Sequence, residues 1–107
     1  MAKIEQTLAG DFDTILGRIE TGIIQGSMSA SLEDSSDFHC GSSRCSVRVF
    51  ERYSYIGNNR VSMNLTLFQC NDTINLSAIT SGGSQAIFWK INTFGESAFL
   101  DKLRELL

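Results

Sequence analysis

The feature that most constrains this chain is an alternation of apolar and polar residues, which runs with short interruptions from residue 44 to residue 91. Successive side chains of a strand point to opposite faces of a sheet, so this period of two predicts β-strands with one apolar face. Four such segments are separated by short runs rich in Gly, Asn, Asp and Ser, residues that favour turns. We therefore expect an antiparallel meander.

The register of this meander can be predicted by requiring the apolar faces of neighbouring strands to coincide, because a slip of one residue would turn every apolar side chain to water. Three pairs satisfy the condition, one for each hairpin: Tyr55 with Val61, Gln69 with Ile74, and Thr80 with Gln85. The predicted core face then consists of Cys45, Val47, Val49, Tyr53, Tyr55, Val61, Met63, Leu65, Leu67, Ile74, Leu76, Ala78, Ile87, Trp89 and Ile91. A helix at residues 85–92 would contradict this arrangement.

Two helices are predicted, one in each half of the chain. After a short strand at residues 3–8, Asp11 is a favourable N-cap for residues 12–26, where apolar side chains recur at helical spacing. This stripe consists of Phe12, Ile15, Leu16, Ile19 and Ile23. Residues 93–96 (TFGE) form a capping box, which predicts the start of the second helix. Its apolar stripe consists of Phe99, Leu100, Leu103, Leu106 and Leu107.

The predicted fold class is α+β with two layers: an antiparallel sheet of about four to six strands, with both helices packed on one face. One strand of the sheet is expected at residues 28–33, before a turn at residues 33–37 (EDSSD). The 107 residues, of which 42% are hydrophobic, fit a single domain over residues 1–107. Twelve acidic against 9 basic residues give a net charge of −3, which argues against nucleic acid as a partner.

The chain is expected to be cytoplasmic, with no membrane partner. Its first residues (MAKIEQTLAGDF) lack the apolar core of a secretory signal, and no run approaches the ~18 apolar residues of a membrane span. An odd number of cysteines suits a reducing compartment better than a set of disulfides. These cysteines are Cys40, Cys45 and Cys70.

The glycine pair in residues 81–84 (SGGS) raises the question of an anion site. Phosphate-binding loops lead from a strand into a helix N-terminus, whose free N–H groups hold the anion. Here the following residues alternate like a strand, so a four-residue hairpin loop is the favoured interpretation. An anion nest formed by Ser81, Gly82, Gly83 and Ser84 remains the alternative.

His39 and Cys40, with Cys45 five residues further on, invite a metal or thiol interpretation. Structural zinc sites use four ligands, usually in pairs with closer cysteine spacing than this one. Cys45 also falls on the predicted core face, where a small apolar residue is expected. We therefore predict no metal, no cofactor and no catalytic residue here, and interpret His39 as an ordinary surface or half-buried side chain.

Arginines and aromatic residues share the face that the predicted register turns away from the core. Three interpretations are open: a surface with scattered aromatics, a homodimer interface, or a site for a small acidic or aromatic ligand. The candidate interface or ligand-binding residues are Arg48, Phe50, Arg52, Phe68, Phe88 and Lys90. Arg44, Arg60 and Ile79 lie on the same predicted face.

Glu51 is the one charged residue on the predicted core face. It is either a carboxyl group whose pKa burial raises, as in a general base, or a side chain at an uncovered edge of the sheet. The first interpretation gives an alternative pocket between sheet and helices, formed by Glu51, Tyr53 and Tyr55.

Two blocks of the sequence carry a resemblance to a known family: residues 44–69 (RCSVRVFERYSYIGNNRVSMNLTLFQ) and residues 76–103 (LSAITSGGSQAIFWKINTFGESAFLDKL). They resemble a small uncharacterised family of bacterial proteins, a domain of unknown function associated with Gram-positive, chiefly clostridial, genomes. The resemblance implies a single-domain bacterial cytosolic protein, without an assigned activity, cofactor or catalytic residue.

Taken together, these patterns favour a non-enzymatic binding or interaction module that forms a homodimer through the outer face of its sheet. The alternative is a small-ligand-binding protein or an enzyme with the pocket around Glu51.

Overall fold

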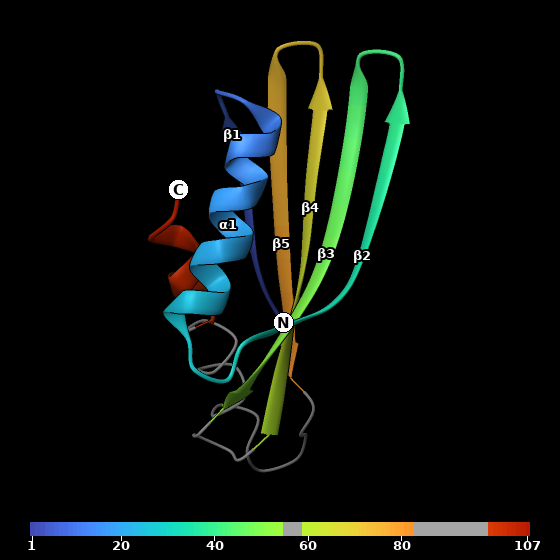
Figure 1. The fold of residues 1–107 in the computed structure, drawn as a ribbon. Coiled ribbons are helices and arrows are strands. Elements are labelled where there is room, and N and C mark those ends of the chain that lie inside the picture. Colours follow the sequence, from blue (N-terminus) through green and yellow to red (C-terminus); the bar gives the residue numbers. More distant parts are fainter. Residues whose placement is uncertain (55–58, 83–98) are drawn as a thin grey trace.

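The computed structural model describes residues 1–54, 59–82 and 99–107 of the chain. Their elements are β1 (Ala2–Leu8), α1 (Phe12–Gly26), β2 (Ser31–Cys40), β3 (Ser43–Ser54), β4 (Asn59–Cys70) and β5 (Thr73–Gly82). Residues 99–104 are also helical. The five strands form one antiparallel sheet in the order β1-β5-β4-β3-β2, with α1 lying along it (Figure 1). The α+β class and the antiparallel sheet are thus confirmed.

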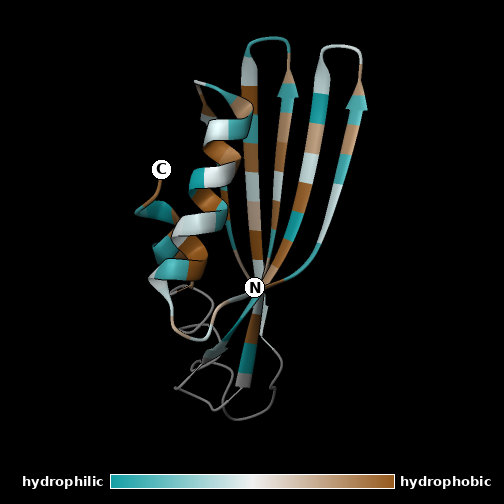
Figure 2. Ribbon diagram, in the orientation of Figure 1, coloured by the Kyte–Doolittle hydropathy of each residue, from teal (hydrophilic) through white to brown (hydrophobic). Residues whose placement is uncertain are grey.

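Helix α1 forms as its sequence predicts. The Asp11 carboxylate caps the helix, because its Oδ2 accepts a hydrogen bond from the backbone N–H of Thr14 at 2.9 Å. All five residues of the predicted apolar stripe are buried, and Figure 2 shows the apolar positions along one side of the helix. The helix ends at Gly26, with Ser27 as the C-cap.

The hydrophobic core combines residues of α1, of the segment 99–103 and of one face of the sheet, which we call the inner face. The pairing of Gln69 with Ile74 is confirmed, and with it the register between β4 and β5. The core residues of these two strands are Val61, Met63, Leu65, Leu67, Ile74, Leu76 and Ala78. Phe99, Leu100 and Leu103 join them from the C-terminal segment.

Strand β3 faces the opposite way from the prediction. Val61 pairs with Arg52 instead of Tyr55, a register shift of three residues. Because the shift is odd, it exchanges the two faces of β3. Phe50 is therefore fully buried on the inner face, whereas three residues predicted for the core lie half-buried on the opposite face: Cys45, Val47 and Val49.

Strand β2 runs through the segment that was predicted to turn. Residues 33–37 are extended and, except for Glu33, pair with β3, and the chain reverses after Cys40 instead, where Gly41 has a φ of +59°. As an edge strand, β2 needs hydrogen bonds on one side only, and charged residues and bulges are common on such strands. Its register shifts between Leu32 and Asp34, which marks a bulge at the acidic segment.

Strand β1 occupies the edge of β5 that the prediction gave to residues 85–91. Ala2 pairs with Thr80 and Leu8 with Ile74, so both sides of β5 are paired over this stretch. The predicted pair of Thr80 with Gln85, the strand at 85–92 and the capping box at 93–96 all fall outside the described residues, at least in part.

Gly22 allows the C-terminal segment to approach α1 closely. A Cβ atom at this position would overlap the side chain of Leu106, whereas one at Gly17 would meet nothing within 4 Å. Gly17 and Gly22 therefore differ, since an added Cβ atom meets a packed side chain only at Gly22.

Candidate functional site

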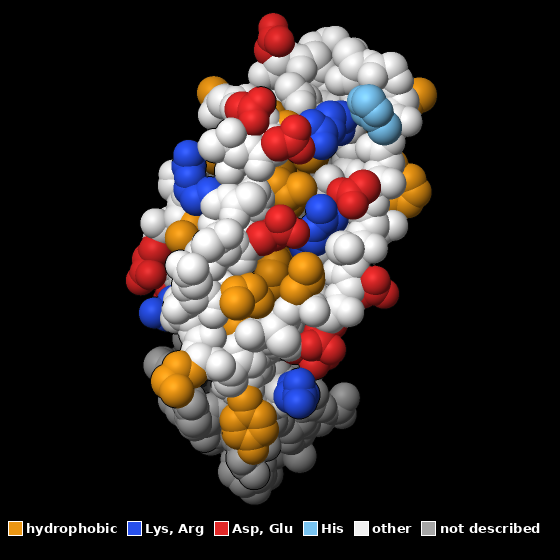
Figure 3. Space-filling model, viewed as in Figure 1, with side chains coloured by type: hydrophobic (Ala, Val, Ile, Leu, Met, Phe, Trp, Pro, Cys, Tyr) orange, Lys and Arg blue, Asp and Glu red, His pale blue; other side chains and the backbone are white. Residues whose placement is uncertain are grey.

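The two faces of the sheet offer different candidate sites. The inner face carries a group of charged residues beside α1, visible as adjoining acidic and basic side chains in Figure 3. The opposite side, which we call the outer face, carries exposed apolar side chains.

Arg48 is the centre of the charged group, and its side chain is only 9% exposed. Its Nε donates to Glu20 Oε2 of α1 at 2.7 Å, and its Nη2 lies 3.0 Å from Asp37 Oδ1 of β2. Its Nη1 donates to the backbone carbonyls of Ser36 and Val47. The buried guanidinium thus has carboxylate and carbonyl partners on three elements, as a buried charge requires.

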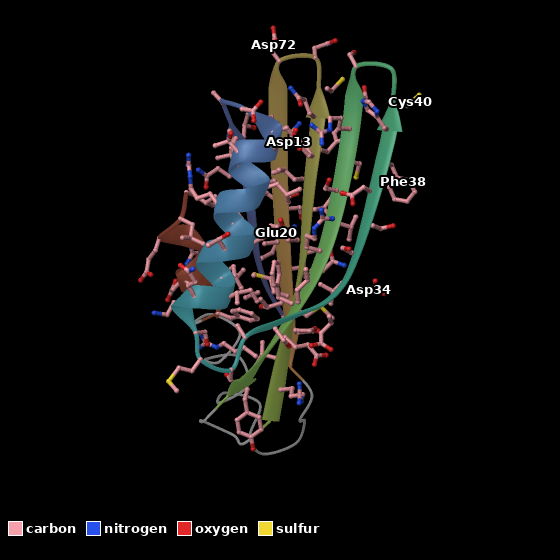
Figure 4. All side chains as sticks on the ribbon, viewed as in Figure 1. Asp13, Glu20, Asp34, Phe38, Cys40 and Asp72 are labelled. Carbon is pink, nitrogen blue, oxygen red and sulfur yellow. The ribbon has the colours of Figure 1, made fainter. Side chains whose placement is uncertain are left out.

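A second ion pair lies nearer the start of the helix. The Arg44 guanidinium donates to both carboxylate oxygens of Asp13, at 2.7 and 3.1 Å, and stands 4.3 Å from the centroid of the Phe12 ring. Figure 4 labels Asp13 and Glu20, the two acidic residues that α1 contributes. The two pairs connect α1 to the hairpin of β2 and β3.

The pKa values of the acidic partners reflect these contacts. The hydrogen bond from Ser46 Oγ at 2.6 Å lowers the pKa of Asp37, and Arg48 lowers it further. The hydrogen bonds from Arg44 lower the pKa of Asp13. Carboxylates held ionised by direct partners are poor general bases, so this group is best interpreted as a structural connection between helix and sheet.

The outer face, in contrast, leaves apolar side chains in solvent. Phe38 is 64% exposed, and Phe68 and Ile79 are 40% and 41% exposed. Half-buried Val47 and Val49 continue the apolar surface between them. No described helix lies over these residues, and Figure 4 shows Phe38 projecting from β2 away from α1.

On the outer face, a shallow hollow lies on each side of Phe68. The first, of about 320 Å³, lies over β1, β5 and β4. It is lined by Glu5, Gln6, Thr7, Thr66, Phe68, Asn75, Leu76 and Ser77. The second, of about 300 Å³, lies over β2, β3 and β4. It is lined by Phe38, His39, Cys40, Ser43, Arg44, Cys45 and Phe68.

The structure divides the predicted interface residues between the two faces. Phe68 lies on the outer face as predicted, and so does Ile79. The predicted outer placement is wrong for Arg48 and Phe50, which are buried on the inner face because of the register shift in β3. Arg52 likewise turns inward, with its guanidinium 5.1 Å from the centroid of the Phe99 ring. Phe88 and Lys90 fall outside the described residues.

The alternative pocket around Glu51 is also misplaced. Because Phe50 points inward, its neighbour Glu51 lies on the outer side, where Arg60 Nη1 donates to its Oε1 at 3.1 Å. Tyr53 is 38% exposed on the same side, and Tyr55 falls outside the described residues. The described part of the chain therefore does not bring this set together between sheet and helices.

The glycine pair and the cysteines are only partly described. Ser81 and Gly82 are the last residues of β5, not loop residues as predicted, and Ser81 Oγ lies 2.8 Å from Ser62 Oγ. Gly83 and Ser84 fall outside the described residues. Cys40, Cys45 and Cys70 are free thiols, and within the described ranges no three His, Cys, Asp or Glu side chains gather as metal ligands would.

Sequence reasoning missed Glu20 and Asp37, which hold Arg48. One signal could have indicated Glu20. Asp13 and Glu20 are seven residues apart in the helix, a distance of ~10 Å, and Arg44 and Arg48 are four apart in a strand, ~13 Å. Two acids on one side of a helix thus match two bases on one face of a strand.

Comparison with known proteins assigns the chain to a family. All of residues 1–107 match the family of unknown function DUF6054. The chain belongs to this family. Its membership agrees with the resemblance seen in the sequence, while the Gram-positive bacterial origin stays a prediction. Among curated proteins, none matches the chain.

The similar solved structures have very low sequence identity to this chain. A protein of unknown function from Pseudomonas aeruginosa, PA94, suggested to be a regulator, has a TM-score of 0.56 at 6% identity, over 100% of this chain and 84% of that one. Hypothetical protein jhp0584 from Helicobacter pylori has a TM-score of 0.46 at 10% identity, over 94% and 83% of the two chains. At this identity the first likeness supports the fold alone.

No helix in the described part of the chain has both the length and the apolar character needed to cross a bilayer. The cytoplasmic location stays a prediction.

Proposed function

We propose that this chain is an interaction module, not an enzyme, and that it forms a homodimer through the outer face of its sheet. The observation that carries the proposal is the exposure of Phe38, Phe68 and Ile79 on one face. Contiguous apolar side chains on a soluble protein mark interaction surfaces more often than single scattered ones do.

The arrangement of charge on the outer face supports the proposal. Its centre, over β3, β4 and β5, carries apolar and neutral polar side chains: Cys45, Val47, Val49, Asn64, Thr66, Phe68, Asn75, Ser77 and Ile79. Charged side chains lie toward the margins, with Lys3 and Glu5 on β1, Asp34 on β2, and Arg60 beside Glu51 at one end. Protein interfaces have this distribution, with few charges at the centre and a polar rim.

The size of the outer face also suits a stable dimer. Five strands spaced about 4.8 Å apart give a width of roughly 24 Å, and strands of 10 residues give a length of roughly 34 Å. The product, roughly 800 Å², equals the surface that each partner buries in a standard interface.

Sedimentation equilibrium at micromolar concentration tests the proposal. We expect the wild type to be a dimer and Phe68→Lys to be a monomer, because a lysine at the centre would be buried without a partner. The matched control is Ile24→Lys, since Ile24 on α1 is 40% exposed, as Phe68 is, but lies on the helix side. A monomeric wild type, or equal effects of the two substitutions, would refute the proposed dimer.

A further inference from the structure

The pairing of the five strands arranges the outer face in rows that cross the whole sheet. One row follows from four successive Cα pairs and reads Asp34, Val49, Asn64, Ile79, Lys3, from β2 to β1. It has an acid at one end, a base at the other, an apolar residue beside each, and a neutral amide on the central strand. If the row is laid against a second copy of itself in reverse order, the acid faces the base and each apolar residue faces an apolar residue.

The row of one copy faces the same row of a second copy in reverse order only if the two-fold axis that relates the copies runs parallel to the strands. Sheets that pack face to face lie about 10 Å apart with nearly aligned strands. A two-fold axis between them and parallel to β4 places β2 of each copy over β1 of the other, and β3 over β5. Asp34 then faces the partner's Lys3, and Val49 faces the partner's Ile79.

A two-fold axis perpendicular to the strands gives a poorer match. It would place each strand over its own copy, so that Asp34 would face β2 of the partner. The outer side of β2 carries Asp34, Ser36, Phe38 and Cys40, none of which is basic. The acid would therefore be covered without a cation, which costs free energy.

The exposed phenylalanine of β2 provides a second, independent reason for the parallel axis. Another row of the outer face reads Phe38, Cys45, Phe68, Asn75, Thr7. Reversed on itself, this row places Phe38 over the partner's Thr7, at the hollow of about 320 Å³ that Thr7, Asn75 and Phe68 line. The most exposed aromatic side chain on this face thus meets a hollow, and Phe68 meets its own copy near the axis.

We propose that the homodimer has its two-fold axis parallel to β4, with Lys3 of each copy paired to Asp34 of the other and Phe38 of each seated in the partner's hollow. This inference rests on the proposed dimerisation through the outer face. In one copy, Lys3 Nζ lies 3.4 Å from Glu5 Oε1, a pair in which both side chains are more than half exposed. Such a pair contributes little, so Lys3 can reorient toward Asp34 of the partner.

Charge reversal tests the axis. We expect Lys3→Glu and Asp34→Lys each to raise the dimer dissociation constant about fivefold at low salt, because each places like charges opposite one another. The double variant should return to within about twofold of the wild type, since the pair is restored in reverse. Sedimentation equilibrium of the four proteins measures the effects.

A second double variant controls for net charge. Lys3→Glu with Asp72→Lys has the same net charge as the test pair, but Asp72 lies in the turn between β4 and β5 (Figure 4), away from the partner's Lys3. It should not rescue the dimer. Suppose that Phe68→Lys dissociates the dimer, but that Asp34→Lys restores dimerisation of Lys3→Glu no better than Asp72→Lys does. The proposed axis is then wrong, whereas the proposed dimer through the outer face is retained. If the wild type is monomeric, both proposals fail.

Discussion

On the inner face of the sheet the charged side chain of Arg48 is 9% exposed, whereas on the outer face the apolar residue Phe38 is 64% exposed. A charged side chain is unusual on the face that packs against the core, and a large apolar side chain is unusual on the face that lies in solvent. The arginine finds its partners within the chain, in Glu20 and Asp37. For Phe38 we infer a partner in a second copy. The unusual side chain on the inner face is thus satisfied within one copy of the chain, whereas for the one on the outer face we propose association with a second copy.

The largest expected difference in stability between the two faces is at two phenylalanines, Phe50 and Phe68. Phe50→Ala should lower the free energy of unfolding by about 3–5 kcal/mol, because the fully buried ring leaves a cavity in the core. Phe68→Ala should cost about 1 kcal/mol or less, because much of its ring is already in solvent. Urea denaturation at low protein concentration, where a dimer contributes little, measures both. Equal losses would show that the two faces are not different in this way.

The next test concerns the helix that covers the inner face. Gly22→Ala should destabilise the fold by about 1–3 kcal/mol, since its Cβ would overlap Leu106. Gly17→Ala should stabilise it by up to about 1 kcal/mol, because alanine favours the helix and the added Cβ meets nothing. Thermal or urea unfolding of the two variants should thus shift in opposite directions. A stabilising Gly22→Ala would mean that Leu106 moves aside freely.

The smallest effect should appear at acid pH. The pKa of Asp37 is lowered in the folded chain by Ser46 and Arg48, so these contacts stabilise the fold above the ordinary aspartate pKa of about 4. Their contribution is lost as the pH falls through the lowered pKa of the folded state. The difference in unfolding free energy between wild type and Asp37→Asn should therefore shrink between pH 6 and pH 3.

The Ser46→Ala background provides the control for this titration. Removing the hydroxyl that donates to Asp37 should reduce the pH-dependent part of the Asp37→Asn effect. Urea denaturation at a series of pH values compares the four proteins. If the difference between wild type and Asp37→Asn is the same at every pH, the carboxylate is not stabilised by these contacts.

The sequence predicted α1, β4 and β5 well because each has local signals that agree. Asp11 and the apolar stripe determine where α1 begins and which side it buries. A tight turn joins β4 and β5, with Asn71 at a φ of +57°, and this leaves little freedom in their register. In these elements, signals from residues close together in the sequence were enough to predict which side chains are buried and which strands pair.

Strand β3 could not be predicted in the same way, because both of its faces contain apolar residues. Cys45, Val47 and Val49 outnumber Phe50, so a count of apolar side chains selects the wrong face. The observed choice depends on Arg48, which is acceptable inside only because Glu20 on another element lies beside it. That dependence is long-range, and a single strand's pattern does not contain it.

The wrong orientation predicted for β3 also affected the predicted interface. With β3 reversed, the predicted interface combined residues from both sides of the sheet, although Phe68 was placed correctly. The exposed Phe38 was missed because residues 33–37 contain turn-forming residues, and the chain was expected to reverse before it. On an edge strand such residues are tolerated, since half of the backbone groups need no ladder partner.

The position of β1 has a consequence for how the chain is made. Ala2 pairs with Thr80, so β1 leaves the ribosome before the other described strands but has its partner only after β5 has been synthesised. Contacts of such large sequence separation form slowly. During translation the hairpins of β2 with β3 and of β4 with β5 can form as each is completed. Strand β1 must meanwhile wait for this partner, and the sheet is completed only once β5 has been made.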